Sequence, residues 1–498
     1  MKKLIFLIPL LLMLVGCQDK TVYVDGPRYN QVKLSTGSER GSLQIVINAL
    51  NSDTDIYYVL LEGKVDTLDI EEIKNPTIQT VDKGSVKGIV NKTIKDLGDD
   101  KDFSVFAVME LNGFHSEVIH STIRTMTEAE ALIQGDGSEE NPFIISEAWQ
   151  LALITTGEYG FGDDNYYELA NDIDLLEAGY NSKNPWIPIG KQNGANRKFG
   201  GVFNGNGYTI RNLVIRDNGG TEKWGLFQET KLDGIIHDLH FDSVDINVEG
   251  FRIATVVGYS KGSLYNVTVK NANIVQPTGE GQVGGIVGAF YESGAIIKAS
   301  FHGDIKADGR RVGGIVGAAT SSGGYDQVSI SDVYFEGSIT GSSTLSRQYG
   351  GVLGAGSGVA IRRSLAKADI KAVRQVGGVV GYNEGIAAYD AIHEDLVYLG
   401  GILHADGSDG NTTVQIGMVV ADIGISKGDY QVSNTYADED SMYTSSSSNS
   451  SRRVDGTLVN KDVFKTMAFY EEFLPNFNFI NVWALVEGIP TLKIEVKS

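Results

Sequence analysis

The sequence predicts an all-β protein in which an N-terminal immunoglobulin- or fibronectin-like sandwich precedes a parallel β-helix with short capping helices. Three patterns lead to this prediction. A glycine phrase recurs through the second half of the chain, and pairs of residues five positions apart recur in step with it. Residues 31–127 hold about seven short alternating strands, the number typical of such sandwiches. A repeated short strand indicates a stacked array, because one unit cannot bury its own apolar face.

The glycine phrase has the form Gly-Gly-Val/Ile-Val/Leu-Gly. It occupies residues 284–288, 313–317, 350–354 and 377–381, and degenerate copies stand at 254–258 and 417–421. A strand that begins with two glycines leaves room for a bend or for a close approach of another backbone. The phrase is therefore interpreted as scaffold and not as a ligand contact.

The second pattern pairs an apolar residue with a small or apolar one five positions later. The first members are Ile210, Ile236, Leu264, Ile296, Ile330 and Ile361. The residue two places after each is polar: Asn212, Asp238, Asn266, Lys298, Asp332 and Arg363. A further copy occupies residues 432–437. The two patterns keep the same order in every repeat, while the number of residues between them varies. This is expected of a parallel β-helix, in which the strands stack in register and the turns vary in length. We expect the polar residues to form a ladder at a bend.

Two segments resemble caps of the array, which we place at residues 131–498. Residues 146–155 are predicted to form an amphipathic helix with Ser146 as its N-cap, covering the open start of the core. Residues 462–474 carry apolar side chains at roughly helical spacing. This second helix is expected to cap the far end.

The first 17 residues predict a signal peptide. Lys2 and Lys3 precede an apolar run at 4–15 and the sequence Leu14-Val15-Gly16-Cys17. The run is too short to span a membrane, which takes about 20 apolar residues. Its end resembles the lipobox of bacterial lipoproteins, which implies lipid attachment at Cys17. The alternative is an ordinary secretory signal. Residues 18–30 then form a polar tether.

Composition limits the partners. The formal net charge of −21 disfavours binding to nucleic acid and to anionic lipid headgroups. No second apolar run of spanning length follows, so the lipid would be the only membrane attachment. We expect the protein on the outer membrane, at the cell surface.

Two family resemblances extend this interpretation. Residues 97–106 resemble the later part of a fibronectin type III domain, where a tyrosine usually stands in place of Phe103. The missing hydroxyl implies that the corner is held by packing, and such domains imply a spacer. The glycine phrase resembles the GLUG repeat of bacterial surface proteins. Residues 186–190, 199–210, 482–485 and 488–492 are similar to the segments that flank such repeats. The resemblance implies a Bacteroidota-type surface lipoprotein but no shared reaction.

A catalytic set is not evident in the sequence. Glycoside hydrolysis needs two carboxylates roughly 5–10 Å apart. Asn266 and Lys298 separate Asp238 from Asp332 in the repeat, and the odd spacing of Asp242 and Asp245 points them to opposite faces of a strand. The acidic run at 406–411 is interpreted as a turn. We assign no catalytic residue and expect neither a metal nor a cofactor.

Binding is the more natural use of a repetitive surface. Tyr259, Tyr291 and Tyr382 follow their glycine phrases and are the candidate ligand contacts, because aromatic rings cover the apolar faces of sugars. Alanines interrupt the row, so packing over a turn is the alternative. The sequence thus predicts a lipid-anchored adhesin or recognition protein for a glycan or a host protein. A β-helix polysaccharide lyase or glycoside hydrolase, and a surface stalk without a ligand, are the alternatives.

Overall fold

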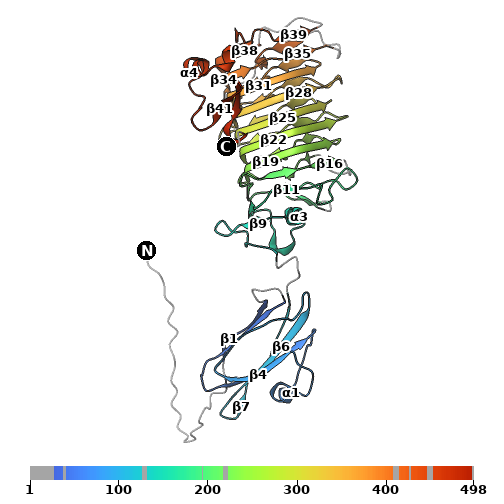
Figure 1. The fold of residues 1–498 in the computed structure, drawn as a ribbon, viewed down its shortest axis with the longest axis vertical. Helices are drawn as coiled ribbons and strands as arrows, with labels where there is room; N and C mark the ends of the chain where they lie inside the picture. The colour runs from blue at the N-terminus through green and yellow to red at the C-terminus, as the bar shows by residue number, and fades with distance from the viewer. Residues whose placement is uncertain are drawn as a thin grey trace, which may run out of the picture. The chain divides into compact units, whose positions relative to one another are not determined.

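The computed structural model describes residues 27, 29–36, 41–125, 132–192, 195–216, 223–407, 414–424, 428–445 and 453–495 (Figure 1). The chain divides into two compact units, Met1–Leu132 and Ile133–Ser498. The predicted fold class is confirmed, because the first unit is an antiparallel sandwich and the second is a parallel β-helix. The predicted signal peptide, Cys17 and most of the tether lie outside the described residues. None of the helices described is long and apolar enough to cross a membrane.

The N-terminal unit consists of two facing sheets. One holds β1 (Tyr29–Thr36), β2 (Leu43–Ala49) and β5 (Ile89–Ile94). The other holds β4 (Asp82–Lys87), β3 (Asp55–Glu62), β6 (Asp102–Leu111), β7 (Phe114–His115) and β8 (Ile119–Arg124). Alternate residues such as Ile45, Ile56 and Val105 fill the space between them, and Phe103 is buried there as well. Phe103 therefore contributes to this core by packing. Helix α1 (Ile70–Lys74) packs on the outer face of the second sheet through Ile73.

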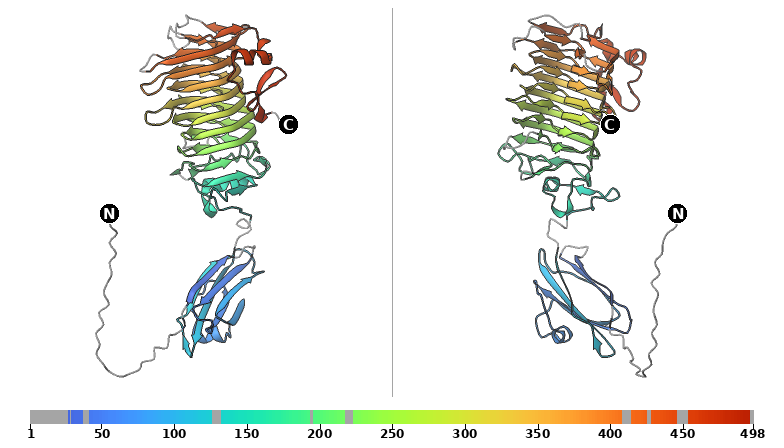
Figure 2. Two further views of the ribbon diagram at one scale, coloured as in Figure 1. Left: turned by 90° about the vertical axis from the view of Figure 1, so that its left-hand side faces the viewer. Right: turned by 180° about the vertical axis from the view of Figure 1, so that it is seen from behind.

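Three parallel sheets form the β-helix, and Figure 2 shows the stacked coils from two further sides. The leading sheet contains β17 (Lys223–Trp224), β20 (Arg252–Ile253), β23 (Gln282–Gly284), β26 (Arg311–Gly313), β29 (Gln348–Gly350), β32 (Gln375–Gly377) and β36 (Gln415–Gly417). The following sheet contains β18 (Phe227–Glu229), β21 (Val257–Ser260), β24 (Val287–Glu292), β27 (Val316–Ser321), β30 (Leu353–Ser357), β33 (Val380–Glu384) and β37 (Val420–Ile423).

The third sheet, here called the flank sheet, carries the longest strands. Its main strands are β19 (Ile235–Asn247), β22 (Ser263–Gln276), β25 (Ala295–Ala307), β28 (Ser329–Thr340), β31 (Ala360–Ala372), β34 (Ala391–Tyr398) and β38 (Tyr430–Asp438). It begins with β9 (Phe143–Ile145), β10 (Tyr166–Leu169), β11 (Ile173–Asp174), β14 (Val202–Asn204), β15 (Thr209–Arg211) and β16 (Val214–Arg216), and ends with β35 (Ile402–Ala405), β39 (Met442–Ser445) and β40 (Thr457–Val459). Inward residues of all three sheets form one continuous apolar core.

The glycine phrase forms the corner between the leading and following sheets. A Cβ atom on Gly285 would overlap the ring of Phe301 on the flank sheet and the carbonyl of Gly314 in the next coil. Gly314 meets Phe335 in the same way, and Gly378 meets Tyr398. In three of the four phrases the second glycine therefore makes room for a large inward side chain from the flank sheet, whereas Gly351 faces the smaller Ala366, and all four have a scaffold role.

The polar residues of the second pattern stand at a bend, as the sequence predicts. Asn212, Asp238, Asn266, Lys298, Asp332 and Arg363 all adopt positive φ angles between 45° and 58°. Neighbouring rungs are joined by side-chain bonds: Asn266 Nδ2 donates to Asp238 Oδ1 at 2.7 Å, and Arg363 Nη2 donates to Asp332 Oδ2 at 2.7 Å. Asp395 and Asn434 continue this bend ladder. Sequence reasoning missed Asp395 because a histidine, His393, replaces the apolar first member of its pair.

The cap at the start of the array differs in detail from the prediction. Helix α3 (Ala148–Thr156) buries Leu151 and Ile154 in the core, so the segment does cover the first coil. Its N-cap is Glu147 and not Ser146. The cause is Gln150, whose Oε1 accepts the backbone N–H groups of Ser146 at 2.7 Å and Glu147 at 3.0 Å.

The second predicted helix is present as part of residues 462–474, but it lies beside the flank sheet and not over the last coil. Residues 463–495, here called the C-terminal strap, lie along the outer face of the flank sheet. The strap contains the 3₁₀ turn η2 (Val463–Lys465), helix α4 (Met467–Phe473), the hairpin β41 (Trp483–Val486) and β42 (Ile489–Leu492), and the 3₁₀ turn η3 (Lys493–Glu495). The last coil is instead covered by Val454, whose N–H bonds the carbonyl of Val420 at 2.8 Å.

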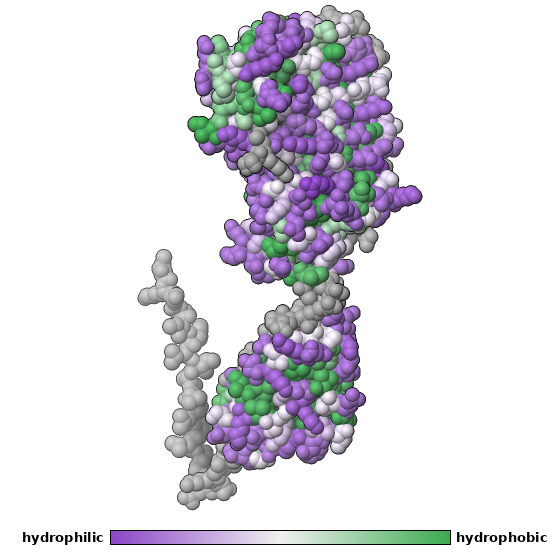
Figure 3. Space-filling view, viewed as in Figure 1, coloured by the Kyte–Doolittle hydropathy of each residue, from purple (hydrophilic) through white to green (hydrophobic). Residues whose placement is uncertain are grey.

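Apolar residues explain the position of the strap. The outward row Tyr334, Leu365 and Val397 on the flank sheet packs against Phe469, Tyr470 and Trp483 of the strap. Two aspartates of the bend ladder bind it as well: Trp483 Nε1 donates to Asp332 at 3.1 Å, and Asn476 Nδ2 donates to Asp395 at 2.8 Å. Figure 3 shows that this side of the array is otherwise mostly hydrophilic.

Candidate ligand groove

A polar groove lies where the outward residues of the leading and following sheets meet beside the glycine corner. Its volume is about 250 Å³. It spans three successive coils and is lined by Arg310, Arg311, Ala318, Ala319, Thr320, Gln348, Ala355, Gly356, Ser357, Tyr382 and Glu384. We refer to it below as the polar groove.

The alternation of strand residues builds the two walls. On the leading sheet, Val312 and Tyr349 point inward, so Arg311 and Gln348 point outward, and the two are in register. Arg311 Nε donates to Gln348 Oε1 at 3.3 Å. On the following sheet Thr320, Ser357 and Glu384 form the opposite row. The floor consists of small side chains because Ala318 and Ala355 stand between these rows.

Tyr382 lines the polar groove in the coil after Ala355. Its hydroxyl donates to Glu384 Oε2 at 2.6 Å, and Ser357 Oγ donates to the other carboxylate oxygen at 3.3 Å. Glu384 is therefore held in place by two hydroxyl groups. The result is an aromatic ring and an oriented carboxylate at the same end of the groove.

The other two candidate tyrosines lie together, outside the polar groove. Their rings meet edge to face at a centroid distance of 5.5 Å. The guanidinium of Arg252 lies 4.7 Å from the centre of the Tyr259 ring, so a cation already covers that ring. Tyr291 Oη accepts a hydrogen bond from Gln282 Nε2 at 2.7 Å. Of the three tyrosines singled out in the sequence, only Tyr382 lines the groove.

Sequence reasoning missed the leading-sheet wall. Arg311 and Gln348, which line the groove, stand two positions before their glycine phrases, and Gln282 and Gln375 hold the same place in the neighbouring coils. The signal in the sequence is a long polar residue, Arg or Gln, directly before an inward valine or tyrosine in these four coils. This position precedes the glycine phrase, whereas the candidate ligand contacts in the sequence all follow it.

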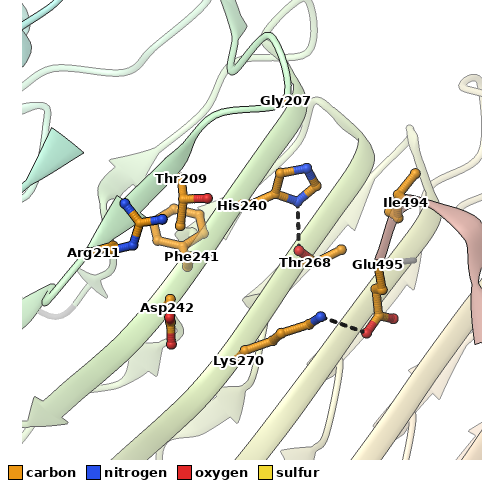
Figure 4. Close-up of a pocket in the computed structure, with 10 residues that line it drawn as sticks. All are labelled: Gly207, Thr209, Arg211, His240, Phe241, Asp242, Thr268, Lys270, Ile494 and Glu495. Carbon is orange, nitrogen blue, oxygen red and sulfur yellow. Dashed lines mark hydrogen bonds and ion pairs between the residues drawn. The ribbon is translucent and has the colours of Figure 1, made fainter. Parts of the chain in front are cut away.

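A second cavity, the flank pocket, lies where the strap ends against the flank sheet (Figure 4). It has a volume of about 300 Å³ and is lined by Gly207, Thr209, Arg211, His240, Phe241, Asp242, Thr268, Lys270, Ile494 and Glu495. His240 Nδ1 and Thr268 Oγ1 are 2.6 Å apart, and Lys270 Nζ lies 3.6 Å from Glu495. The pocket thus brings two carboxylates, Asp242 and Glu495, to one cavity.

The electrostatics of the flank pocket favour structure over catalysis. His302 Nε2 lies 2.8 Å from the buried carboxylate of Glu495. Burial alone would lower the pKa of His302, but hydrogen bonds and charge from Glu336 and Glu495 outweigh it and raise the pKa to about 9. Burial raises the pKa of Glu495, but the hydrogen bond and charge of His302 outweigh burial and keep that pKa below its usual value. Glu495 is therefore an ionised partner of His302 and not a proton donor.

Metal coordination is not indicated by the described part of the chain, where no group of three or more His, Cys, Asp or Glu side chains converges. The acidic run at 406–411 lies mostly outside the described residues, so its interpretation as a turn stays a prediction.

Comparisons with known proteins do not assign a family to the chain. No family model matches the chain. It is 26% identical over 278 residues to halomucin of Haloquadratum walsbyi, an alignment that covers 53% of this chain and 3% of halomucin. The chain therefore spans a small fraction of that relative. A family 28 exopolygalacturonase of Yersinia enterocolitica is 10% identical, with 88% of this chain and 99% of that chain covered. Its TM-score of 0.16 is too low to support an argument.

Proposed function

We propose that the protein is a lipid-anchored, non-catalytic recognition protein that binds a glycan through the polar groove. The observation that carries this proposal is the groove itself, where planar polar side chains, hydroxyl groups and Tyr382 converge over a floor of alanine. A binding site of this kind presents donors and acceptors at fixed positions to sugar hydroxyls, while the ring covers an apolar sugar face. The groove is on rigid strands, which keeps the entropy cost of binding low.

A binding role is favoured over hydrolysis by the carboxylates. Within the polar groove Glu384 is the one carboxylate among the lining residues, and a glycosidase needs two. In the flank pocket Glu495 is committed to its ion pair with His302. A polysaccharide lyase or glycoside hydrolase therefore stays the second candidate, with the two carboxylates of the flank pocket as the observation that favours it.

The location and anchor are part of the same proposal. The lipobox-like sequence ending at Cys17 supports lipid attachment at the outer membrane, and the GLUG-like phrase supports a place at the cell surface. The net charge of −21 argues against nucleic acid as a partner. A host protein is the alternative ligand.

The proposal is tested by probing a glycan array and a panel of matrix proteins with residues 19–498, while the supernatant is assayed for new reducing ends and unsaturated sugars. We expect selective retention without cleavage. Tyr382→Ala should lower retention at least tenfold. Tyr430→Ala, at an exposed tyrosine of the flank sheet, is the matched control and should leave it unchanged. Released product would support the enzyme, and an array without any retention would support the stalk.

A further inference from the structure

Two adjacent arginines in the polar groove have no acidic partner. Arg310 and Arg311 both line the groove, and among the described residues neither forms an ion pair with a carboxylate. Arg311 bonds the neutral amide of Gln348. By contrast, ion pairs with Asp or Glu are formed by Arg124, Arg197, Arg211, Arg216, Arg362, Arg363 and Arg453.

This arrangement is unusual for a chain with 63 acidic and 42 basic residues. Carboxylates are plentiful, so nearby arginines without one are the exception. A guanidinium presents a planar set of donors that matches a carboxylate or sulfate group in two parallel hydrogen bonds. The two arginines therefore offer an anion site at one end of the polar groove.

The opposite end of the groove has the opposite polarity. Arg311 stands in the coil of Ala318, Gln348 in the coil of Ala355, and Glu384 in the coil of Tyr382. Coils stack about 4.8 Å apart, so the arginine and glutamate ends are separated by roughly 10 Å. A ligand that fits both ends carries an anionic group at one end and hydroxyl donors for Glu384 at the other.

We propose that the polar groove selects an anionic saccharide, bearing one carboxylate or sulfate beside neutral sugar hydroxyls. This inference rests on the proposed function and specifies its ligand class. A dense polyanion is disfavoured, because Glu384 lies in the groove and the net charge of −21 repels repeated negative charge. A short oligosaccharide, or a polymer with widely spaced acidic groups, fits both constraints.

The test is a titration of residues 19–498 with four probes of equal length: a neutral oligosaccharide, one ending in glucuronate, its methyl ester, and a sulfate monoester. We expect the glucuronate or the sulfate monoester to bind at least tenfold more tightly than the neutral probe and the ester. Tight binding of the glucuronate probe alone identifies a carboxylate ligand. Tight binding of the sulfate monoester alone identifies a sulfate ligand. Raising the salt concentration should weaken binding of the anionic probes and leave the ester unchanged.

The matched variants are the double substitutions Arg310→Gln with Arg311→Gln, and Lys306→Gln with Lys371→Gln. Both remove two positive charges, but the lysines are exposed on the flank sheet. The arginine variant should lose the preference for the anionic probes while its unfolding midpoint stays unchanged, and the lysine variant should keep it. Equal binding of all four probes, or equal losses in both variants, overturns the inference and leaves glycan binding standing. Failure of every probe to bind overturns both proposals.

Discussion

Single side chains decide how closely the coils approach one another. The second glycines Gly285, Gly314 and Gly378 each face a large inward residue of the flank sheet. His393 fills a position that Ile330 and Ile361 occupy in earlier coils. His393 is fully buried, and its ring bonds Asn383 at 3.1 Å. The steric effect at the second glycines and the ionisation of His393 should therefore be measurable as changes in the free energy of unfolding.

Gly314→Ala tests the steric role. The new Cβ would overlap the Phe335 ring and the backbone of Gly351, and neither can move without disturbing the next coil. We expect a loss of about 2–3 kcal/mol in the free energy of unfolding. Gly323→Ala is the control, because its Cβ would meet Ala388 at an ordinary 3.6 Å. Urea denaturation of both variants measures the difference, and equal stabilities would contradict the scaffold role.

His393 tests the ionisation effect. Burial lowers its pKa to about 4, so the native state requires the neutral ring while the unfolded chain binds a proton near pH 6.5. The free energy of unfolding is therefore unaffected by His393 above pH 6.5, where the ring is neutral in both states. It decreases as the pH falls toward 4, because the unfolded chain gains a proton that the native state does not bind. Relative to His393→Leu, the natural chain should lose about 2 kcal/mol between pH 7.5 and pH 5. Denaturation at the two pH values measures this. The surface variant His404→Leu should behave as the natural chain does.

Elements of the array depend on contacts that join distant parts of the sequence. The C-terminal strap is held by an apolar cluster, by the aspartates of the bend ladder and by the buried ion pair of Glu495. His302 pairs with Glu495 in the last turn of the strap. Glu336 and Tyr334 also lie against the His302 ring, and Lys270 lies near Glu495. Lys367 pairs with Glu336 at 2.8 Å. The end of the strap should consequently respond to the protonation of His302.

Alkaline pH should loosen the end of the strap. The pKa of His302 is raised from 6.5 to about 9, so its stabilising charge is fully present below pH 6.5 and is lost as the pH rises through 9. Hydrogen exchange at residues 489–495, corrected for intrinsic rates, should be faster at pH 10 than at pH 7. His302→Gln should exchange rapidly at both values. A strap that stays protected at pH 10 in the natural chain would contradict this role.

At the scale of the whole molecule, the proposed surface location depends on Cys17. Cys17→Ser should abolish labelling by a fatty-acid analogue and shift the protein from the membrane fraction to the soluble fraction. Surface protease treatment of intact cells distinguishes the outer face from the periplasmic face. An ordinary secretory signal would instead leave the location of the Cys17→Ser variant unchanged.

The fold was largely predictable because its regularities are local and repeated. Two short patterns in constant phase identify stacked strands even when the connecting lengths vary, and the positive φ of the bend ladder follows from the polar residue at its third place. Asp395 escaped only because His393 broke the apolar pattern. The start of α3 was displaced by one residue because Gln150, three residues after Glu147, accepts the Glu147 N–H and so fixes Glu147 as the N-cap.

The candidate site was predictable only in part. The residue after each glycine phrase lies between the two walls of the polar groove, so Tyr382 was identified. Tyr259 also directly follows its phrase and Tyr291 stands two positions further on, yet Arg252 contacts the first ring and Gln282 bonds the second hydroxyl. Contacts across the corner of a single coil, with Arg252 seven residues before Tyr259 and Gln282 nine residues before Tyr291, decide which of these positions stays open to a ligand.

The sequence by itself determined the all-β class, the coil register, the corner glycines and the bend ladder, because strand period and steric demand act over a few residues. Only the tertiary structure decided that residues 463–495 lie along the flank, that Arg310 and Arg311 have no acidic partner, and that Glu495 is neutralised by His302. These features depend on which side chains meet across the array, and local spacing carries no information about that.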